Sequence, residues 1–200
     1  HSVATLPHDR SNLLWEGGKS GAVTKMFSAS IDRWIDAMVA DEHGGGQSTN
    51  VVISAVVTAK QSGVIAGQCV IDRMIQQHFA SCNVSWSIEE GGRAAVGDVV
   101  LTIEGIADSV LRCERIMLNL LGRMSGIATN TAEWVESSNS MGVACTRKTE
   151  WGLLDKWAVH IGGGLTHRLD RSDALMIKEN DLPALAPEAP DELSAVSQVV

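Results

Sequence analysis

The last third of the chain alternates strand-like and helix-like segments, and this alternation limits the possible folds more than any other feature of the sequence. Residues 142–145 and 174–177 are short and mostly apolar, as strands are, whereas residues 153–161 have the length and apolar content of a helix. The glycine triplet Gly162–Gly164 follows that helix. Because consecutive strands joined through a helix are usually parallel, the pattern predicts a parallel α/β layer or barrel.

The first half of the chain mixes helices and strands in a different order. Its apolar spacing predicts helices over 31–39 and 70–79, and strands over 51–57, 84–88 and 99–103. This order is typical of an α+β domain with an open sheet. We therefore divide the chain into an irregular N-terminal segment, an α+β N-terminal domain and the first part of an incomplete, truncated α/β barrel, over residues 1–30, 31–108 and 109–200.

A long amphipathic helix is expected after Gly105, with Asp108 as its N-cap. Its apolar face comprises Val110, Cys113, Met117, Leu120, Leu121 and Met124. Another stripe of the same helix carries three arginines, Arg112, Arg115 and Arg123. Helical periodicity alone predicts that this stripe is a solvated polar face.

Composition excludes several classes of protein. Of the 200 residues, 44% are hydrophobic and 20% are charged, which is typical of a globular chain and not of a disordered one. The formal net charge of −8 argues against binding to nucleic acid or to anionic membranes, and no apolar run reaches the length of a membrane helix. The four cysteines are widely scattered, so we expect reduced thiols in a cytoplasmic chain and no zinc site or disulfide framework.

Cationic side chains follow the expected strands of the C-terminal part. Arg147 and Lys148 come directly after the first of these strands, and Lys178 follows the second. His167 and Arg168 end the glycine-rich loop between them. Because catalytic groups of parallel α/β folds gather at the carboxyl ends of strands, these five groups suit a ligand with several negative charges. The alternative is that each cation forms an ordinary surface salt bridge with a nearby carboxylate, and spacing alone favours neither.

Five sequence blocks, in this order and spacing, resemble the quinolinate phosphoribosyltransferase family, also called nicotinate-nucleotide pyrophosphorylase (carboxylating). They are Glu114–Asn119 continuing through Ser125–Thr129, then Thr146–Thr149, Gly162–Gly164, His167–Arg168 and Lys178–Asn180. The similarity extends from about Ser48, through Lys60–Gly67, to about Leu182. The combination is far more specific than any single block.

The resemblance implies a pentosyltransferase of NAD biosynthesis. Such an enzyme transfers phosphoribose from phosphoribosyl pyrophosphate to the ring nitrogen of quinolinate and releases carbon dioxide and pyrophosphate, and Mg²⁺ accompanies the donor. Carried over by motif, the residues that hold the quinolinate carboxylates are Arg147, His167, Arg168 and Lys178. Lys148 would face the donor, and Thr146 would support the same strand end. The resemblance makes Lys148 and Lys178 the catalytic candidates. Arg115 would reach into the site of a neighbouring subunit, because the family forms homodimers or higher homo-oligomers with shared active sites.

The chain departs from the family pattern at two places, and two other functions stay open. Asp181 stands where the family usually has His, and Glu150–Trp151 stands where Thr-Pro is common. The chain also ends at Val200, before the strands that supply the acidic residues for ribose and magnesium, so no metal ligand is assigned. The alternatives are a related phosphoribosyltransferase-like protein of molybdenum utilisation and a non-catalytic anion-binding or dimerisation fragment.

Overall fold

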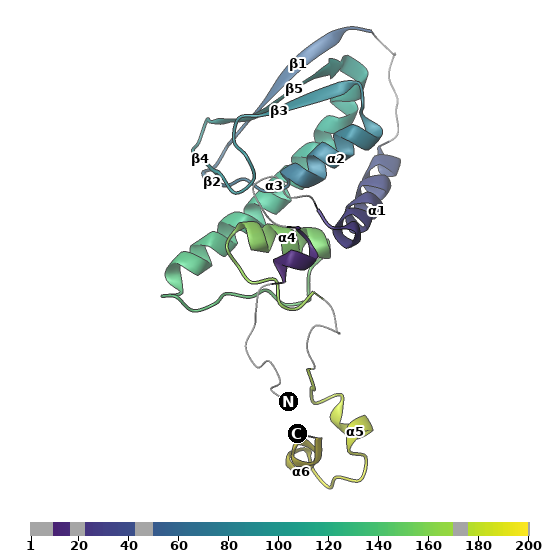
Figure 1. Cartoon of the computed structure of the whole chain (residues 1–200), viewed down its shortest axis with the longest axis vertical. Helices are drawn as coiled ribbons and strands as arrows, with labels where there is room; N and C mark the ends of the chain where they lie inside the picture. Colours follow the sequence, from purple (N-terminus) through teal and green to yellow (C-terminus); the bar gives the residue numbers. More distant parts are fainter. Residues whose placement is uncertain (1–9, 17–22, 43–49, 170–175, 200) are drawn as a thin grey trace. The chain divides into compact units, whose positions relative to one another are not determined.

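A computed structural model describes residues 10–16, 23–42, 50–169 and 176–199 of the chain. These residues belong to two compact units, one within Pro7–Leu169 and the other after Asp170, and each is described by itself. The larger unit combines an antiparallel sheet with four α-helices (Figure 1). It opens with the short 3-10 helix η1 (Ser11–Leu13).

The sheet has three antiparallel strands in the order β1 (Val52–Thr58), β5 (Val99–Ile106) and β3 (Cys82–Trp86). Register places Ala55 beside Ile103 and Ile103 beside Val84, so one face of the sheet is continuously apolar. A separate two-stranded ladder joins β2 (Gly63–Val64) and β4 (Arg93–Ala94). The three main strands confirm the expected open sheet, whereas the two-residue strands were not predicted.

Two helices, α2 (Gln68–His78) and α3 (Ala107–Ser137), pack against the apolar face of this sheet (Figure 1). Helix α1 (Lys25–Asp41) contacts α2, α3 and α4 (Leu153–Ile161). The expected apolar face of α3 is buried at all six positions. The strands and helices bury their apolar side chains in one continuous core, and this burial contributes most to the stability of the unit.

Helix α2 begins and ends within two residues of its prediction, whereas the starts of α1 and α3 differ in the residues that cap them. Helix α1 begins at Lys25 rather than near Ile31, because the Thr24 hydroxyl accepts a hydrogen bond from Phe27 N at 3.2 Å and caps the helix. The assignment of Asp108 as N-cap was wrong. Ile106 occupies the cap position without a side-chain hydrogen bond, and Asp108 lies in the first turn, where its charge favours the helix dipole.

Hydroxyl groups of α3 hold the β2 segment in place. Thr129 Oγ1 accepts a hydrogen bond from Val64 N at 2.9 Å, and Ser125 Oγ accepts one from Ala66 N at 3.0 Å. Thr129 also donates to Ser125 O at 2.7 Å within the helix. The two hydroxyl groups therefore accept hydrogen bonds from backbone N–H groups that find no partner in the short β2–β4 ladder.

A carboxylate caps the N-terminus of α2. Glu90 accepts hydrogen bonds from Gly67 N at 2.9 Å, Cys69 N at 3.3 Å and Trp157 Nε1 at 2.9 Å. Burial raises the pKa of Glu90, while these three donors act in the opposite direction. Glu90 thereby connects the sheet domain to α4.

The C-terminal unit contains two short helices, α5 (Leu182–Leu185) and α6 (Glu192–Val199), around a small apolar cluster of Leu182, Ala186 and Ala195. Part of the strand expected over 174–177 lies outside the described residues, and the described residues 176–178 have no regular secondary structure.

All four cysteines are free, as expected, with Cys82 and Cys113 buried and Cys69 and Cys145 half-buried. No helix among the described residues is both long and apolar enough to cross a membrane.

Candidate active site

An isolated parallel β-bridge on either side of α4 brings two of the cation-bearing segments side by side. Ala144 forms a parallel bridge with Leu165, and Leu165 N donates to Val143 O at 2.7 Å. Helix α4 connects the two segments and spans the predicted residues 153–161. The strand expected over 142–145 is reduced to the bridge at Ala144, and its partner lies at Leu165, in the segment expected to be a loop, rather than at 174–177. Because the paired segments run in the same direction, the residues that follow Ala144 and Leu165 emerge on the same side.

The first segment beyond this bridge carries Thr146, Arg147 and Lys148. All three are exposed, and Thr146 Oγ1 accepts a hydrogen bond from Lys148 N at 3.1 Å. The hydroxyl of Thr146 therefore shapes the turn from which both cations project. The role of Thr146 in ligand binding stays a prediction.

The second segment carries His167 and Arg168, which are half-buried. The preceding Thr166 is fully buried, and its hydroxyl accepts a hydrogen bond from Arg10 N at 2.6 Å. Gly162 and Gly164 are also buried, directly against α3. Close packing on α3 thus fixes the backbone from which His167 and Arg168 extend.

Lys178 lies in the C-terminal unit and is exposed. Its backbone N–H donates to Asp181 Oδ2 at 2.9 Å, and Asp181 N donates to Lys178 O at 2.8 Å. Asp181, one of the two departures from the family pattern, therefore closes the turn that carries Lys178. That Lys178 joins the other cations around one ligand stays a prediction.

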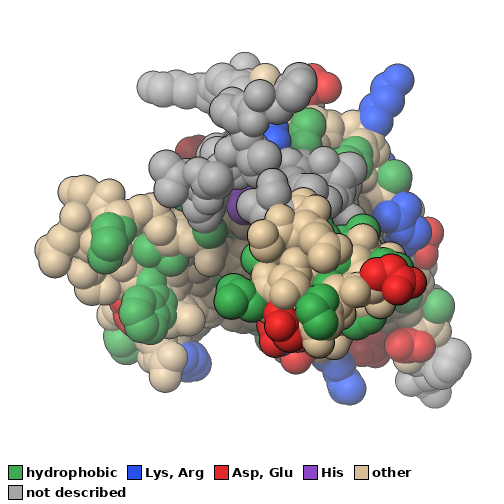
Figure 2. Space-filling model, turned by 90° about the horizontal axis from the view of Figure 1, so that it is seen from below, with side chains coloured by type: hydrophobic (Ala, Val, Ile, Leu, Met, Phe, Trp, Pro, Cys, Tyr) green, Lys and Arg blue, Asp and Glu red, His purple; other side chains and the backbone are tan. Residues whose placement is uncertain are grey.

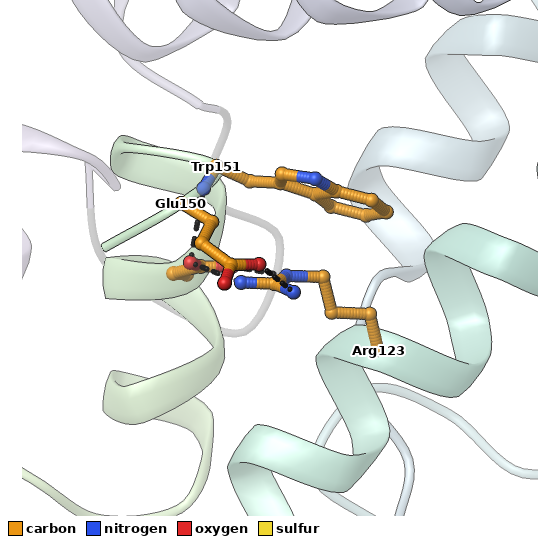
Figure 3. A network of polar contacts seen from close by, with 4 residues as sticks. Arg123, Glu150 and Trp151 are labelled. Atoms are coloured by element: carbon orange, nitrogen blue, oxygen red, sulfur yellow. Dashed lines mark hydrogen bonds and ion pairs between the residues drawn. The ribbon is translucent and has the colours of Figure 1, made fainter.

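The three arginines of the α3 stripe have different surroundings. Arg115 is 76% exposed and pairs only loosely with Glu42, at 3.4 Å between Nε and Oε1. Arg112 is half-buried. Arg123 forms two hydrogen bonds with Asp155 and one with Glu150 (Figure 3). The stripe is therefore not one uniform solvated face.

Among the residues coloured by type in Figure 2, the basic side chains form no broad patch on the face shown. Figure 2 shows Lys and Arg side chains separated by acidic and neutral residues on the face it presents. This distribution agrees with the net charge of −8. Across the described ranges, no cluster of three or more His, Cys, Asp or Glu side chains could hold a metal ion.

Comparison with known proteins identifies the family. The sequence model for the quinolinate phosphoribosyl transferase N-terminal domain matches residues 38–125, and the model for the C-terminal domain matches residues 127–198. The chain belongs to the quinolinate phosphoribosyltransferase family. The expected fold class, an α+β open-sheet domain followed by the first part of an α/β barrel, is confirmed. The domain boundaries drawn from the sequence remain predictions.

Individual relatives support this assignment. A probable nicotinate-nucleotide pyrophosphorylase (carboxylating) of Archaeoglobus fulgidus is 42% identical over 136 residues, which cover 65% of this chain and 52% of that protein. The corresponding protein of Mycobacterium leprae is 38% identical over 151 residues, covering 72% and 53%. The crystal structure of NadC from Streptococcus pyogenes aligns with a TM-score of 0.72 and 32% identity, covering 85% of this chain and 64% of that one. The chain thus spans about half the length of these two curated relatives.

Sequence reasoning missed three residues behind the cations, Arg123, Asp155 and Lys156. The sequence placed Arg123 on a solvated polar stripe, offered Asp155 only as one of several surface salt-bridge partners and gave no role to Lys156, because the observed partners are distant in sequence or are backbone atoms. The hydrogen bond from Arg123 to Asp155 spans 32 positions, beyond the reach of helical periodicity. The signal in the sequence was the adjacent charged pair Asp155–Lys156 within the mostly apolar helix 153–161.

Proposed function

We propose that this chain carries part of the active site for phosphoribosyl transfer to quinolinate, with decarboxylation to nicotinate mononucleotide. The observation that carries the proposal is the parallel bridge between Ala144 and Leu165, from which Arg147–Lys148 and His167–Arg168 follow in a chain of this family. The names of the relatives, nicotinate-nucleotide pyrophosphorylase (carboxylating), support the same reaction. The four free thiols are compatible with a reducing compartment such as the cytoplasm.

Quinolinate is a dicarboxylate, which suits the proposed cation set. We assign its carboxylates to Arg147, His167, Arg168 and Lys178, and the phosphoribosyl donor to Lys148. Guanidinium groups bind carboxylates through paired hydrogen bonds, and ammonium groups add compact positive charge. These contacts would orient the ring nitrogen toward the sugar carbon.

Positioning and charge stabilisation, rather than a protein nucleophile, would then accelerate the reaction. The nitrogen lone pair forms the new bond to the sugar carbon as the bond to pyrophosphate breaks. The resulting pyridinium ring stabilises the electron pair that remains when carbon dioxide leaves, and a proton replaces the lost carboxylate. Cations beside the leaving pyrophosphate would offset its developing charge, which is the role proposed for Lys148.

Magnesium is proposed to arrive with the pyrophosphate donor. The described residues contain no cluster of three or more possible metal ligands. We assign no residue of this chain to the ion.

Titration calorimetry with quinolinate and with nicotinate tests the proposed substrate. We expect quinolinate to bind measurably and nicotinate, which lacks the second carboxylate, to bind at least about tenfold more weakly. Equal binding of the two acids would contradict the dicarboxylate assignment and favour a general anion-binding role. Absence of binding to either acid would contradict a ligand site within this chain.

We also propose that α3 forms an interface with a second copy of the chain. Arg115 is 76% exposed, and its neighbours on the helix, Leu111 and Leu118, are 62% and 40% exposed. Exposed apolar side chains around an arginine are typical of interface centres. Such an interface would allow Arg115 to enter the partner's site, as the family resemblance implies.

Sedimentation equilibrium checks this interface. We expect the chain to form a dimer and Leu118→Arg to shift it to monomer, because the introduced charge would be buried without a partner. Leu193→Arg in α6 is the control, since Leu193 is 81% exposed and lies in the other unit. A monomeric wild-type chain, or a Leu118→Arg chain that stays dimeric, would contradict the proposal.

A further inference from the structure

Two adjacent residues of α4 hold the two ends of the segment that carries Arg147 and Lys148. At one end, Lys156 Nζ donates a hydrogen bond to Cys145 O at 3.3 Å. At the other end, Asp155 Oδ2 accepts one from Trp151 N at 3.0 Å. Asp155 and Lys156 are only 3% and 2% exposed, so both attachments are made inside the protein.

Arg123 extends this arrangement to α3. Its Nε and Nη2 donate to the two carboxylate oxygens of Asp155 at 2.9 and 2.8 Å, and its Nη1 donates to Glu150 Oε2 at 2.8 Å. The guanidinium carbon also lies 4.7 Å from the centre of the Trp151 ring, so the ring covers one face of the guanidinium while the carboxylates bind its edge (Figure 3). A planar fork held on several sides has little freedom to rotate.

These contacts differ in expected strength. The Asp155 side chain is 5% exposed, so its pairing with Arg123 is shielded from water, and this hydrogen bond raises the pKa of Arg123 above its usual range. The Glu150 side chain is 79% exposed, and its ion pair with Arg123 contributes less. Asp155 is therefore the main partner of Arg123.

The position of these groups suggests a purpose beyond general stability. Thr146, Arg147 and Lys148 are exposed and lie in an irregular segment between the Ala144 bridge and α4. The side chains just described attach that segment at its beginning and at its end. A displacement of about 1 Å in a binding group can cost on the order of a hundredfold in rate, so a segment of this kind needs external support.

We propose that Arg123, Asp155 and Lys156 are positioning residues that hold the Arg147–Lys148 segment in the geometry in which both cations meet an anionic ligand. The identity of that ligand rests on the proposed function, whereas the support of the segment does not. The two parts can therefore be tested separately in the full 200-residue chain.

Limited digestion with trypsin tests the support of the segment without any ligand, because trypsin cleaves after Arg147 and Lys148. We expect Arg123→Ala to increase the cleavage rate at these two sites by about tenfold, since local release of a segment controls its proteolysis. Peptide mass spectrometry identifies the sites. Arg123→Lys keeps the charge but not the fork, so it should restore protection only in part.

Arg73→Ala is the matched control. Arg73 also forms a forked pair with a carboxylate, with Nη2 at 2.8 Å from Asp32 Oδ2, and its side chain is 29% exposed compared with 28% for Arg123. That pair joins α2 to α1 and does not involve the cation segment. We expect Arg73→Ala to leave cleavage after Arg147 and Lys148 within about twofold of wild type at matched unfolding stability.

Quinolinate titration provides the second readout. We expect Arg123→Ala to raise the dissociation constant roughly 10- to 100-fold, the range found when groups that orient a ligating residue are removed. Arg73→Ala should leave the dissociation constant within about twofold. If Arg123→Ala fails to fold, Arg123→Lys and Glu150→Gln provide milder losses of the same contacts, and both should accelerate cleavage.

The outcomes separate the two proposals. Faster cleavage in Arg123→Ala without quinolinate binding in wild type supports the positioning role and contradicts the proposed substrate. If the cleavage rate and the dissociation constant of Arg123→Ala are the same as those of Arg73→Ala, the positioning role is overturned, even when wild type binds quinolinate.

Discussion

Replacement of Arg147 by alanine should weaken quinolinate binding by at least about 30-fold, which corresponds to about 2 kcal/mol. Arg147 is exposed, so its charge is well hydrated before binding. A bound dicarboxylate would displace that water and form a paired hydrogen bond with the guanidinium. We expect a free-energy loss at the lower end of the range for charge-assisted hydrogen bonds, because the cost of removing water from Arg147 offsets part of the binding free energy. Titration calorimetry measures the change.

Arg93→Ala is the control for loss of an arginine. Arg93 lies on β4, pairs with Glu136 and has a side chain that is 65% exposed. We expect its removal to change the dissociation constant by less than about twofold, because exposed ion pairs contribute little. Similar affinities of Arg147→Ala and wild type would exclude Arg147 from the binding site.

Replacement of Gly162 by alanine should destabilise the larger unit by about 3 kcal/mol, the upper end of the usual range for overpacking. A Cβ at this position would overlap the carbonyl oxygen of Ala128 and lie 2.7 Å from Thr131 Cβ, both in α3. Backbone atoms cannot move aside as a flexible side chain can, so α3 and α4 would have to separate. Urea unfolding followed by circular dichroism measures the loss.

Gly126→Ala is the matched control on α3, because a Cβ there meets no atom within 4 Å. In a helix this change should be neutral or stabilise by roughly 0.5–1 kcal/mol, since alanine loses less backbone entropy on folding than glycine. A Gly162→Ala chain as stable as Gly126→Ala would show that α3 and α4 do not pack as closely as described.

Local sequence patterns predicted those elements whose signals are short in range. Helix α4 was predicted over 153–161 and spans Leu153–Ile161, because its apolar run lies between Gly152 and Gly162. The apolar face of α3 followed from the helical period for the same reason. By contrast, β2 and β4 have two residues each, too few for any alternation to be recognised.

The candidate site shows the same division. The motif blocks named the candidate cations, whose roles stay predictions. The strand order predicted from the sequence paired residues 142–145 with 174–177, whereas the structure pairs Ala144 with Leu165, in the segment expected to be a loop. The sequence assigned no role to the departures from the family pattern, Glu150–Trp151 and Asp181. In the structure, Glu150 and Trp151 both contact Arg123, and Asp181 closes the turn of Lys178.

The amino-acid sequence alone determined the family, the order of the main helices and strands, and the chemical type of the groups offered to a ligand, because residue type and local spacing encode these properties. Only the tertiary structure decided that Arg123 pairs with Asp155 behind the cation segment and that Gly162 packs on α3 without space for a side chain. Those contacts join residues distant along the chain, and their geometry exists only after the helices have packed against one another.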